Sequence, residues 1–262
     1  GNAVAVQHFI DLGEAISRGK EALHEQLLQQ LYTMSEEKPE EVVKVVVAES
    51  DKCLPPLIES LRSKIQAIQL DTANILLRLM TSKDELSSAK LQLLIAEHRG
   101  VSPFVLMSIS TVPAHQTTGS RGLGVLAKQV ANRQSIEESG GIKPLIILLL
   151  SLNESLQLAA ATALATLLSG FGKDEQFEHI PPLMRRKTAM YGGLETAVRM
   201  LVLERTPQTV LEQVARICAF LSEEESVRFR LASQSAMGHY GLEMITRHVR
   251  SAMKTSGASK ER

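Results

Sequence analysis

The sequence predicts an all-α fold, a right-handed α-solenoid in which one small group of helices is repeated. Aromatic residues make up only 3% of the 262 residues and Trp is absent. Frequent Ala and Leu favour closely packed helices over a sheet sandwich. Apolar residues recur three and four positions apart, as on one face of a helix. The chain also resembles itself at a spacing of roughly 40 to 47 residues, which is typical of helical repeats.

Three prolines mark the period of this repeat. Pro56, Pro103 and Pro144 occupy similar apolar segments and lie 47 and 41 residues apart. The same register aligns three amphipathic segments that each end on a leucine, residues 69–79, 116–126 and 157–167. A fourth copy begins at Tyr191 and ends at Leu221. Four copies predict stacked units, because a single unit cannot bury its apolar faces alone.

The expected elements follow in chain order within one domain, residues 1–250. Residues 1–50 form an N-terminal helical cap, in which Ser35 is the expected N-cap of a helix rich in Glu and Val. Repeat units then lie near residues 51–92, 93–134, 135–170 and 188–225. A cluster of Gly, Pro and charged residues predicts an insertion over 170–187. A partial unit over 226–253 and a flexible tail over 254–262 complete the chain.

Paired glycines predict the turns inside the units. Gly140 and Gly141 precede one apolar run, and Gly192 and Gly193 precede another. Gly adopts positive φ without the steric cost of a Cβ, which suits a sharp turn from a first helix into a second. A proline near the start of the second helix lacks a donor that would be unpaired there. The Ala-rich third helix is then able to approach its neighbours closely.

Residues 136–167 nearly spell the pattern I…SGGIxPLIxLLxS…QxxAAxALxxL. This segment resembles the armadillo repeat, and residues 53–79, 95–126 and 189–221 resemble it to a fair degree. The resemblance implies units of three helices that stack into a solenoid with an extended concave face lined by the third helices.

The charge and the cysteines limit the classes of partner. The 29 basic and 29 acidic residues cancel, so no overall field attracts nucleic acid or an anionic membrane. Cys53 and Cys218 lie in apolar helical patterns and are expected to be buried thiols in a reducing compartment. No run of about 18 apolar residues predicts a membrane span. We therefore expect a cytoplasmic protein, which an acylated N-terminus missing from this chain could still tether to the cytosolic face of an organelle.

No motif predicts catalysis, a cofactor or a metal site. His24 begins half of a zinc motif, but Leu28 stands where the second His is required, so an exposed helical His is expected. Residues 119–124, GSRGLG, lack the order of a phosphate loop, and their glycines are expected to serve close helix packing. We therefore expect no enzyme activity.

The candidate binding residues lie on the third helices. Armadillo nuclear-import receptors carry there a Trp slot for basic side chains and, four residues later, an Asn that clamps the peptide backbone. Aligned on the terminal leucines, this chain departs from that pattern at every copy. The partner-binding groove is expected to consist of Asn74, Arg78, Arg121, Val125, Thr162, Thr166, Arg216 and Phe220.

Three of these side chains are arginines, which would repel a basic cargo and suit carboxylates or phosphorylated residues. The catenin branch of the family uses basic grooves for acidic partners in a similar way. A second basic patch is expected at Arg185, Arg186 and Lys187, for a partner or acidic lipid. The alternative in both places is that the charges simply solvate a helix or loop.

The favoured function is a non-catalytic adaptor or scaffold that binds an acidic or helical segment of another protein. The compact, repeat-only architecture resembles the "armadillo repeats only" proteins of apicomplexan parasites, which are acylated cytosolic adaptors on rhoptries. That resemblance implies a lipoprotein that positions a secretory organelle through a myosin partner. The alternative is a nucleotide-exchange factor for the seventy-kilodalton heat-shock chaperones, an armadillo fold of similar length.

Overall fold

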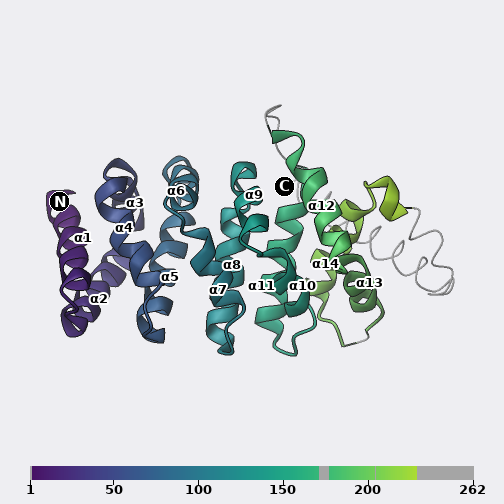
Figure 1. Ribbon diagram of the computed structural model, residues 1–262, viewed down its shortest axis with the longest axis horizontal. Helices are drawn as coiled ribbons and strands as arrows, with labels where there is room; N and C mark the ends of the chain where they lie inside the picture. Colours follow the sequence, from purple (N-terminus) through teal and green to yellow (C-terminus); the bar gives the residue numbers. More distant parts are fainter. Residues whose placement is uncertain (1, 171–176, 204, 229–262) are drawn as a thin grey trace. The chain divides into compact units, whose positions relative to one another are not determined.

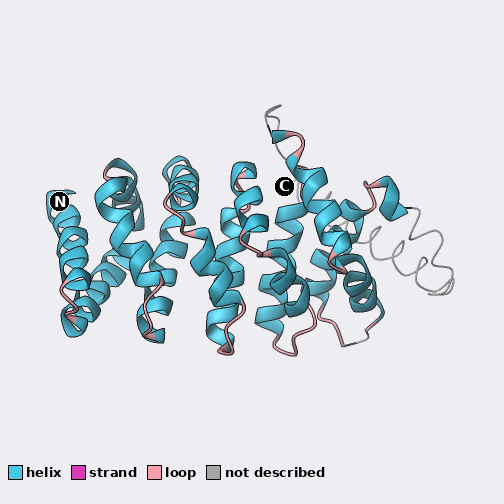
Figure 2. Cartoon of the chain, in the orientation of Figure 1, coloured by secondary structure: helices cyan, strands magenta, loops and turns pink. Residues whose placement is uncertain are grey.

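The computed structural model describes residues 2–170, 177–203 and 205–228 (Figure 1). In these residues every regular element is a helix (Figure 2), so the predicted all-α class is confirmed. The chain divides into two compact units, residues 1–139 and 140–262. No helix among the described residues combines the length and the apolar character needed to cross a membrane.

The first unit consists of helices joined by short turns. Their bounds are α1 (Asn2–Ser17), α2 (Glu21–Glu37), α3 (Pro39–Ala48), α4 (Ser50–Leu61), α5 (Gln66–Met80), α6 (Glu85–Glu97), α7 (Val101–Ser108), α8 (Pro113–Leu126) and α9 (Val130–Glu138).

Helices three places apart in this order pack against each other. Helix α4 contacts α1 and α7, helix α5 contacts α2 and α8, and helix α6 contacts α3 and α9. Phe9 on α1, Leu54 on α4 and Phe104 on α7 are fully buried and belong to the core of the unit. Three helices are therefore the repeating step of the first unit, and α5 and α8 hold equivalent places as third helices.

The second unit contains α10 (Ile142–Leu148), α11 (Glu154–Leu168), α12 (Ile180–Met190), α13 (Gly193–Val202) and α14 (Gln208–Leu221). Helix α11 contacts α10, α12 and α14. Its alanines Ala160, Ala161, Ala163 and Ala165 are completely buried. Their small side chains let several helices approach α11, as the sequence predicted for the third helix.

Two of the predicted glycine turns are confirmed. Gly140 and Gly192 have φ angles of +80° and +83°, in the left-handed region that glycine tolerates best. The turn from α6 to α7 differs, because Arg99 takes the positive φ, 62°, and Gly100 does not. A Cβ on Gly100 would lie 2.5 Å from the side chain of Ile95, so glycine is required there for space.

The predicted N-cap at Ser35 is wrong. Helix α2 continues to Glu37, and the hydroxyl of Ser35 donates a hydrogen bond to the carbonyl of Tyr32. Helix α3 begins instead at Pro39, because proline has no N–H to continue the bonding of α2 and its fixed φ suits a first helical position.

The second helices begin differently from one another. Pro103 and Pro144 are the third residues of α7 and α10, in the first turn as expected. Pro56 follows Pro55 inside α4. That helix begins earlier, at Ser50, and only one residue separates it from α3. The first-turn explanation therefore does not apply to Pro56.

The expected insertion over 170–187 lies partly in a helix. Residues 171–176 are outside the described residues, but α12 begins at Ile180, and Pro181 and Pro182 occupy its first turn. The partial unit expected over 226–253, beyond residue 228, and the tail over 254–262 lie outside the described residues. The boundaries of the repeat units stay a prediction.

Candidate partner-binding surface

The eight predicted groove residues form four pairs on the third helices. Each pair spans one helical turn, so its two side chains share a face. All eight side chains are exposed or half-buried, whereas most of the residues between the two members of each pair are buried. The pairs are Asn74 and Arg78 on α5, Arg121 and Val125 on α8, Thr162 and Thr166 on α11, and Arg216 and Phe220 on α14.

Helices α5 and α8 pack side by side in the first unit, and α11 and α14 do so in the second. Each unit therefore carries two neighbouring pairs of the predicted groove. Asn74 and Val125 are half-buried, and Thr162 is exposed. The hydroxyl of Thr166 donates to the carbonyl of Thr162 at 2.8 Å, so its proton is already used within α11.

Arg78 is held by helix α2. Its guanidinium lies 2.8 Å from a carboxylate oxygen of Glu36 and donates to the hydroxyl of Ser35 at 3.1 Å. It also lies 4.6 Å from the centre of the Tyr32 ring, in cation–π contact. The side chain of Arg78 is only 30% exposed. Arg78 therefore joins α5 to α2, the helix three places earlier in the chain. The carboxylate of Glu36 already neutralises much of its charge.

Arg121 and Arg216 are more accessible. Both side chains are exposed. Arg121 forms no ion pair or hydrogen bond with a described residue, and Arg216 donates to the side-chain oxygen of Gln213 at 3.0 Å. Phe220 is half-buried one turn from Arg216. Within the predicted groove, each unit thus presents an exposed guanidinium with an apolar side chain one turn away, Val125 in the first and Phe220 in the second.

The predicted basic patch at residues 185–187 has only one fully exposed member. Arg185 is 7% exposed, lies 2.7 Å from the carboxylate of Glu223 and donates to the carbonyl of Leu168 at 3.3 Å. Arg186 is exposed, and Lys187 is half-buried with an interaction of its own. Arg185 therefore has a structural position, fastening α12 to the end of α11 and to the segment after α14.

Comparisons with known proteins agree with this arrangement. Residues 130–169 match the family described as Armadillo/beta-catenin-like repeat. A crystal structure of computationally designed armadillo repeat proteins for modular peptide recognition superposes with a TM-score of 0.72 at 15% identity, covering 97% of this chain and 99% of that one. The fold is that of an armadillo-repeat protein. The predicted fold class is confirmed.

Two further solved structures share this armadillo fold. A designed armadillo repeat protein in complex with peptide (KR)4 gives a TM-score of 0.71 at 15% identity, covering 95% of this chain and 97% of that one. An engineered protein gives 0.70 at 18% identity, covering 94% of this chain and 97% of that one. No curated protein matches the sequence.

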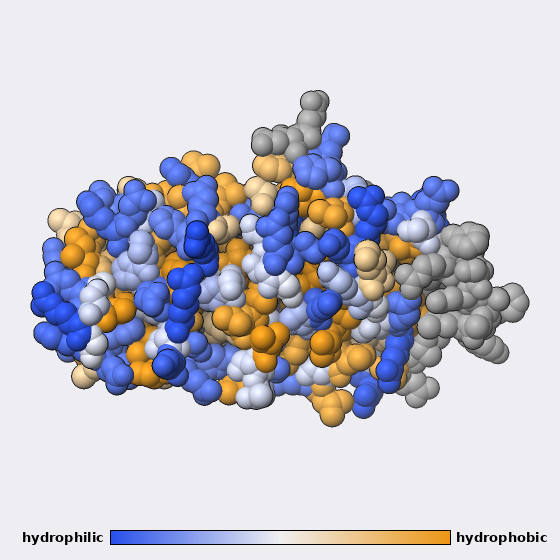
Figure 3. All heavy atoms as spheres, in the orientation of Figure 1, coloured by the Kyte–Doolittle hydropathy of each residue, from blue (hydrophilic) through white to orange (hydrophobic). Residues whose placement is uncertain are grey.

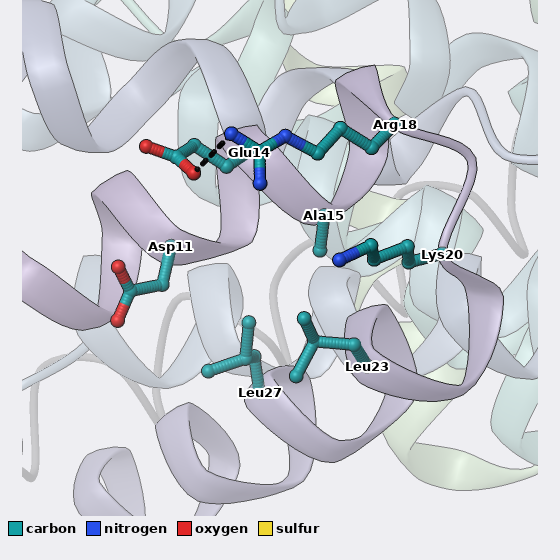
Figure 4. A pocket seen from close by; sticks show the side chains of 7 residues that line it. All are labelled: Asp11, Glu14, Ala15, Arg18, Lys20, Leu23 and Leu27. Carbon is teal, nitrogen blue, oxygen red and sulfur yellow. Dashed lines mark ion pairs between the residues drawn. The ribbon is translucent and has the colours of Figure 1, made fainter.

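A small hollow between α1 and α2 lies at one end of the first unit (Figure 4). Leu23 and Leu27 line one side of it, and Asp11, Glu14, Arg18 and Lys20 surround the rest. Glu14 and Arg18 form an ion pair at 3.2 Å. Charges of both signs cancel there, so this hollow does not extend the basic character of the third helices.

The expectation that His24 is exposed on a helix is wrong. His24 is 7% exposed, and its Nε2 lies 2.9 Å from the hydroxyl of Ser60. Burial lowers the pKa of His24, so the neutral ring is favoured. Across the described residues, no three His, Cys, Asp or Glu side chains gather as a metal site.

The sequence did not point to the residues that hold Arg78. Tyr32, Ser35 and Glu36 lie on α2, whose sequence shows little likeness to the later third helices. Only the packing of α2 against α5 places them beside Arg78. Apolar side chains also show on the surface among polar ones (Figure 3), and some exposed ones, such as Leu86 on α6, lie on other helices than the third ones.

Proposed function

We propose that this protein is a non-catalytic scaffold that binds an acidic segment of a partner protein on its third helices. The observation that supports the proposal most directly is the pair of exposed guanidiniums, Arg121 and Arg216, each with an apolar neighbour one turn away. A guanidinium offers planar donors that match carboxylates and phosphates. The neighbouring Val125 and Phe220 add apolar contact area.

The armadillo fold supports a peptide as the ligand. One designed armadillo repeat protein with this fold was solved with the basic peptide (KR)4. In this chain the third helices carry exposed arginines instead, which repel such a peptide and leave its charges unpaired. We therefore infer the opposite charge preference, for Asp-, Glu- or phosphate-rich segments.

Two peptides of equal length and opposite charge test the preference. We expect a fluorescent peptide of four Asp–Glu repeats to bind in an anisotropy titration, and the peptide (KR)4 not to bind. Arg121→Glu with Arg216→Glu should weaken binding at least about tenfold, because each substitution replaces an attraction by a repulsion. Lys90→Glu, on the exposed side of α6, is the matched charge control.

Arg78 is a poor site for this test, because Arg78→Glu would face Glu36 and break the contact between α2 and α5. Circular dichroism should first show that the other variants keep the helix content of the wild type. Equal binding of both peptides, or an unchanged affinity in the double variant, would contradict the proposal.

The narrower role is an adaptor tethered through an acylated N-terminus, which positions a secretory organelle through a myosin. It is supported by the resemblance in sequence architecture alone. The test is to determine the native N-terminus. This role predicts Gly and Cys beside the initiator Met and incorporation of a labelled acyl chain. The rival role, nucleotide exchange on a seventy-kilodalton chaperone, predicts faster release of a labelled nucleotide when this protein is added.

A further inference from the structure

A hollow in the second unit lies on a different surface from the predicted groove. It opens between the segment joining α10 to α11 and the segment joining α13 to α14. Its polar lining residues bond to the backbone: the side-chain amide of Gln157 donates to the carbonyl of Leu149 at 2.8 Å, and Thr206 donates to the carbonyl of Met200 at 3.0 Å. These bonds fix the two segments that form the rim.

The rim carries apolar side chains in unusually open positions. Leu152 is 82% exposed and Leu150 is 41% exposed, and half-buried Leu203 faces the hollow from the other segment. Ile147 lies on α10, three residues before Leu150, and is 68% exposed. Exposed large apolar residues scattered singly need no explanation, but three leucines that line one hollow are typical of an interaction site.

Two cations stand beside these leucines. Arg199 and Arg205 line the same hollow and are exposed, and neither forms an ion pair or hydrogen bond with a described residue. Glu154 also lines the hollow. Two exposed guanidiniums that lack a carboxylate partner among the described residues offer donors to an anionic group next to an apolar one.

We propose that this hollow docks an acidic segment of a partner protein that carries large apolar side chains, with carboxylates on Arg199 and Arg205 and an apolar side chain against Leu150 and Leu152. This site would be separate from the third-helix surface and would let the scaffold hold a second segment. The proposal stands on the charge and apolar complementarity of the rim, and does not depend on the function proposed for the third helices.

A labelled peptide in which two Glu residues flank two Leu residues, repeated twice, is the probe, and its Lys-for-Glu counterpart is the charge control. We expect the acidic peptide to bind in anisotropy titrations and the basic one not to bind. Arg199→Glu with Arg205→Glu should weaken binding at least about tenfold, as should Leu150→Ser with Leu152→Ser.

Matched controls are available in the first unit. Leu86 is 84% exposed on α6, so Leu86→Ser should leave binding unchanged, and Lys90→Glu should do the same. All of these titrations are made in a chain that also carries Arg121→Glu with Arg216→Glu, which removes the third-helix surface as a competing site for acidic peptides and so separates the two proposed sites. Hydrogen exchange should slow on binding over residues 148–153 and 205–210.

Several results would overturn the proposal. They include failure of the acidic peptide to bind and binding that survives both double variants. Protection from hydrogen exchange confined to α5, α8 or the third-helix faces of α11 and α14 would also contradict the proposal. Concentration-dependent self-association that Leu152→Ser abolishes would assign the rim to a second copy of this chain. Binding to phosphatidylserine vesicles in place of the peptide would assign it to a membrane surface.

Discussion

One missing methyl group sets the distance between α7 and α8. A Cβ on Gly119 would lie 2.6 Å from the backbone nitrogen of Ser108 and 2.7 Å from the backbone carbonyl of Phe104. Backbone atoms in a helix cannot move aside as the end of a long side chain can. A Cβ on Gly122 would likewise meet the ring of Phe104, so Gly119 and Gly122 serve helix packing, as the sequence predicted.

We expect Gly119→Ala to lower the free energy of unfolding by about 1–3 kcal/mol, the usual cost of overpacking. The measurement is urea unfolding followed by circular dichroism. Gly13→Ala is the control, because the nearest atom to its added Cβ would be at 3.7 Å, an ordinary contact. Alanine is the better helix former, so Gly13→Ala should stabilise by about 0.5–1 kcal/mol. A neutral effect of Gly119→Ala would show that α7 and α8 can separate freely.

Arg99 presents the opposite case, a side chain where glycine fits better. Its φ of 62° costs an L-residue roughly 1–2 kcal/mol. Arg99→Gly removes that strain. Glycine also makes the unfolded chain more flexible, which offsets part of the gain, so we expect a net stabilisation of about 0.5–1 kcal/mol. The midpoint in urea should rise while the slope of the transition stays constant. The backbone N–H of Arg99 donates to the carbonyl of Ala96 at 3.0 Å, and Arg62 donates to the carbonyl of Arg99 at 3.3 Å; neither bond uses the Arg99 side chain, so the substitution keeps both. A lower midpoint would show that the Arg99 side chain contributes more than its strain costs.

At the scale of single helices, the start of α6 depends on one carboxylate. Asp84 accepts a hydrogen bond from the backbone N–H of Ser87 at 3.1 Å and lies 3.4 Å from the ammonium of Lys44 on α3. The backbone bond from Ser87, followed by the Ser87 hydroxyl and Lys44, lowers the pKa of Asp84. A charged Asp84 therefore stabilises the folded state.

The pH dependence follows from the sign of that shift. Because the folded pKa lies below the unfolded value of about 3.9, the stabilisation by Asp84 is complete above that pH and is lost as the pH falls through the folded pKa. Asp84→Asn keeps a capping oxygen without the charge, so wild type should exceed it in stability at neutral pH and converge with it in acid. Urea unfolding at a series of pH values measures this. Glu37→Gln, at an exposed carboxylate that forms no ion pair with a described residue, is the control. A difference that persists unchanged in acid would contradict the assignment.

How far the sequence predicts each helix depends on what ends it. The aligned segments 69–79, 116–126 and 157–167 all lie within α5, α8 and α11, because their apolar spacing reflects burial along the helix itself. The start of α3 was misplaced, because both Ser35 and Pro39 are good starting signals and only packing decides between them. The partners of Arg78 and Arg185 were missed for a related reason: each contact joins residues more than 15 positions apart, and no local pattern encodes it.

At the scale of the whole molecule, each compact unit contains one cysteine. Cys53 lies in the first unit and Cys218 in the second, and both are free and buried, as predicted. Burial raises the pKa of each thiol to about 12. At neutral pH neither thiol is therefore reactive until the helices around it open.

The two thiols report separately on the two units. We expect iodoacetamide to label Cys53 and Cys218 only in urea, as measured by mass spectrometry of their peptides. Gly119→Ala lies in the first unit and should lower the urea concentration at which Cys53 is labelled, with little change at Cys218. Equal shifts at both cysteines would show that the chain unfolds as one cooperative body.

The packing of helices three places apart also bears on how the chain acquires its structure. Each helix of the first unit finds its partners, such as α2 for α5 or α4 for α7, within a few tens of residues of sequence. Such short loops close quickly and at small entropic cost. Residues 1–139 form a compact unit of their own, so their core is able to begin forming while the ribosome is still synthesising the second unit. The nascent protein would then expose few apolar surfaces to chaperones and proteases at any moment of its synthesis.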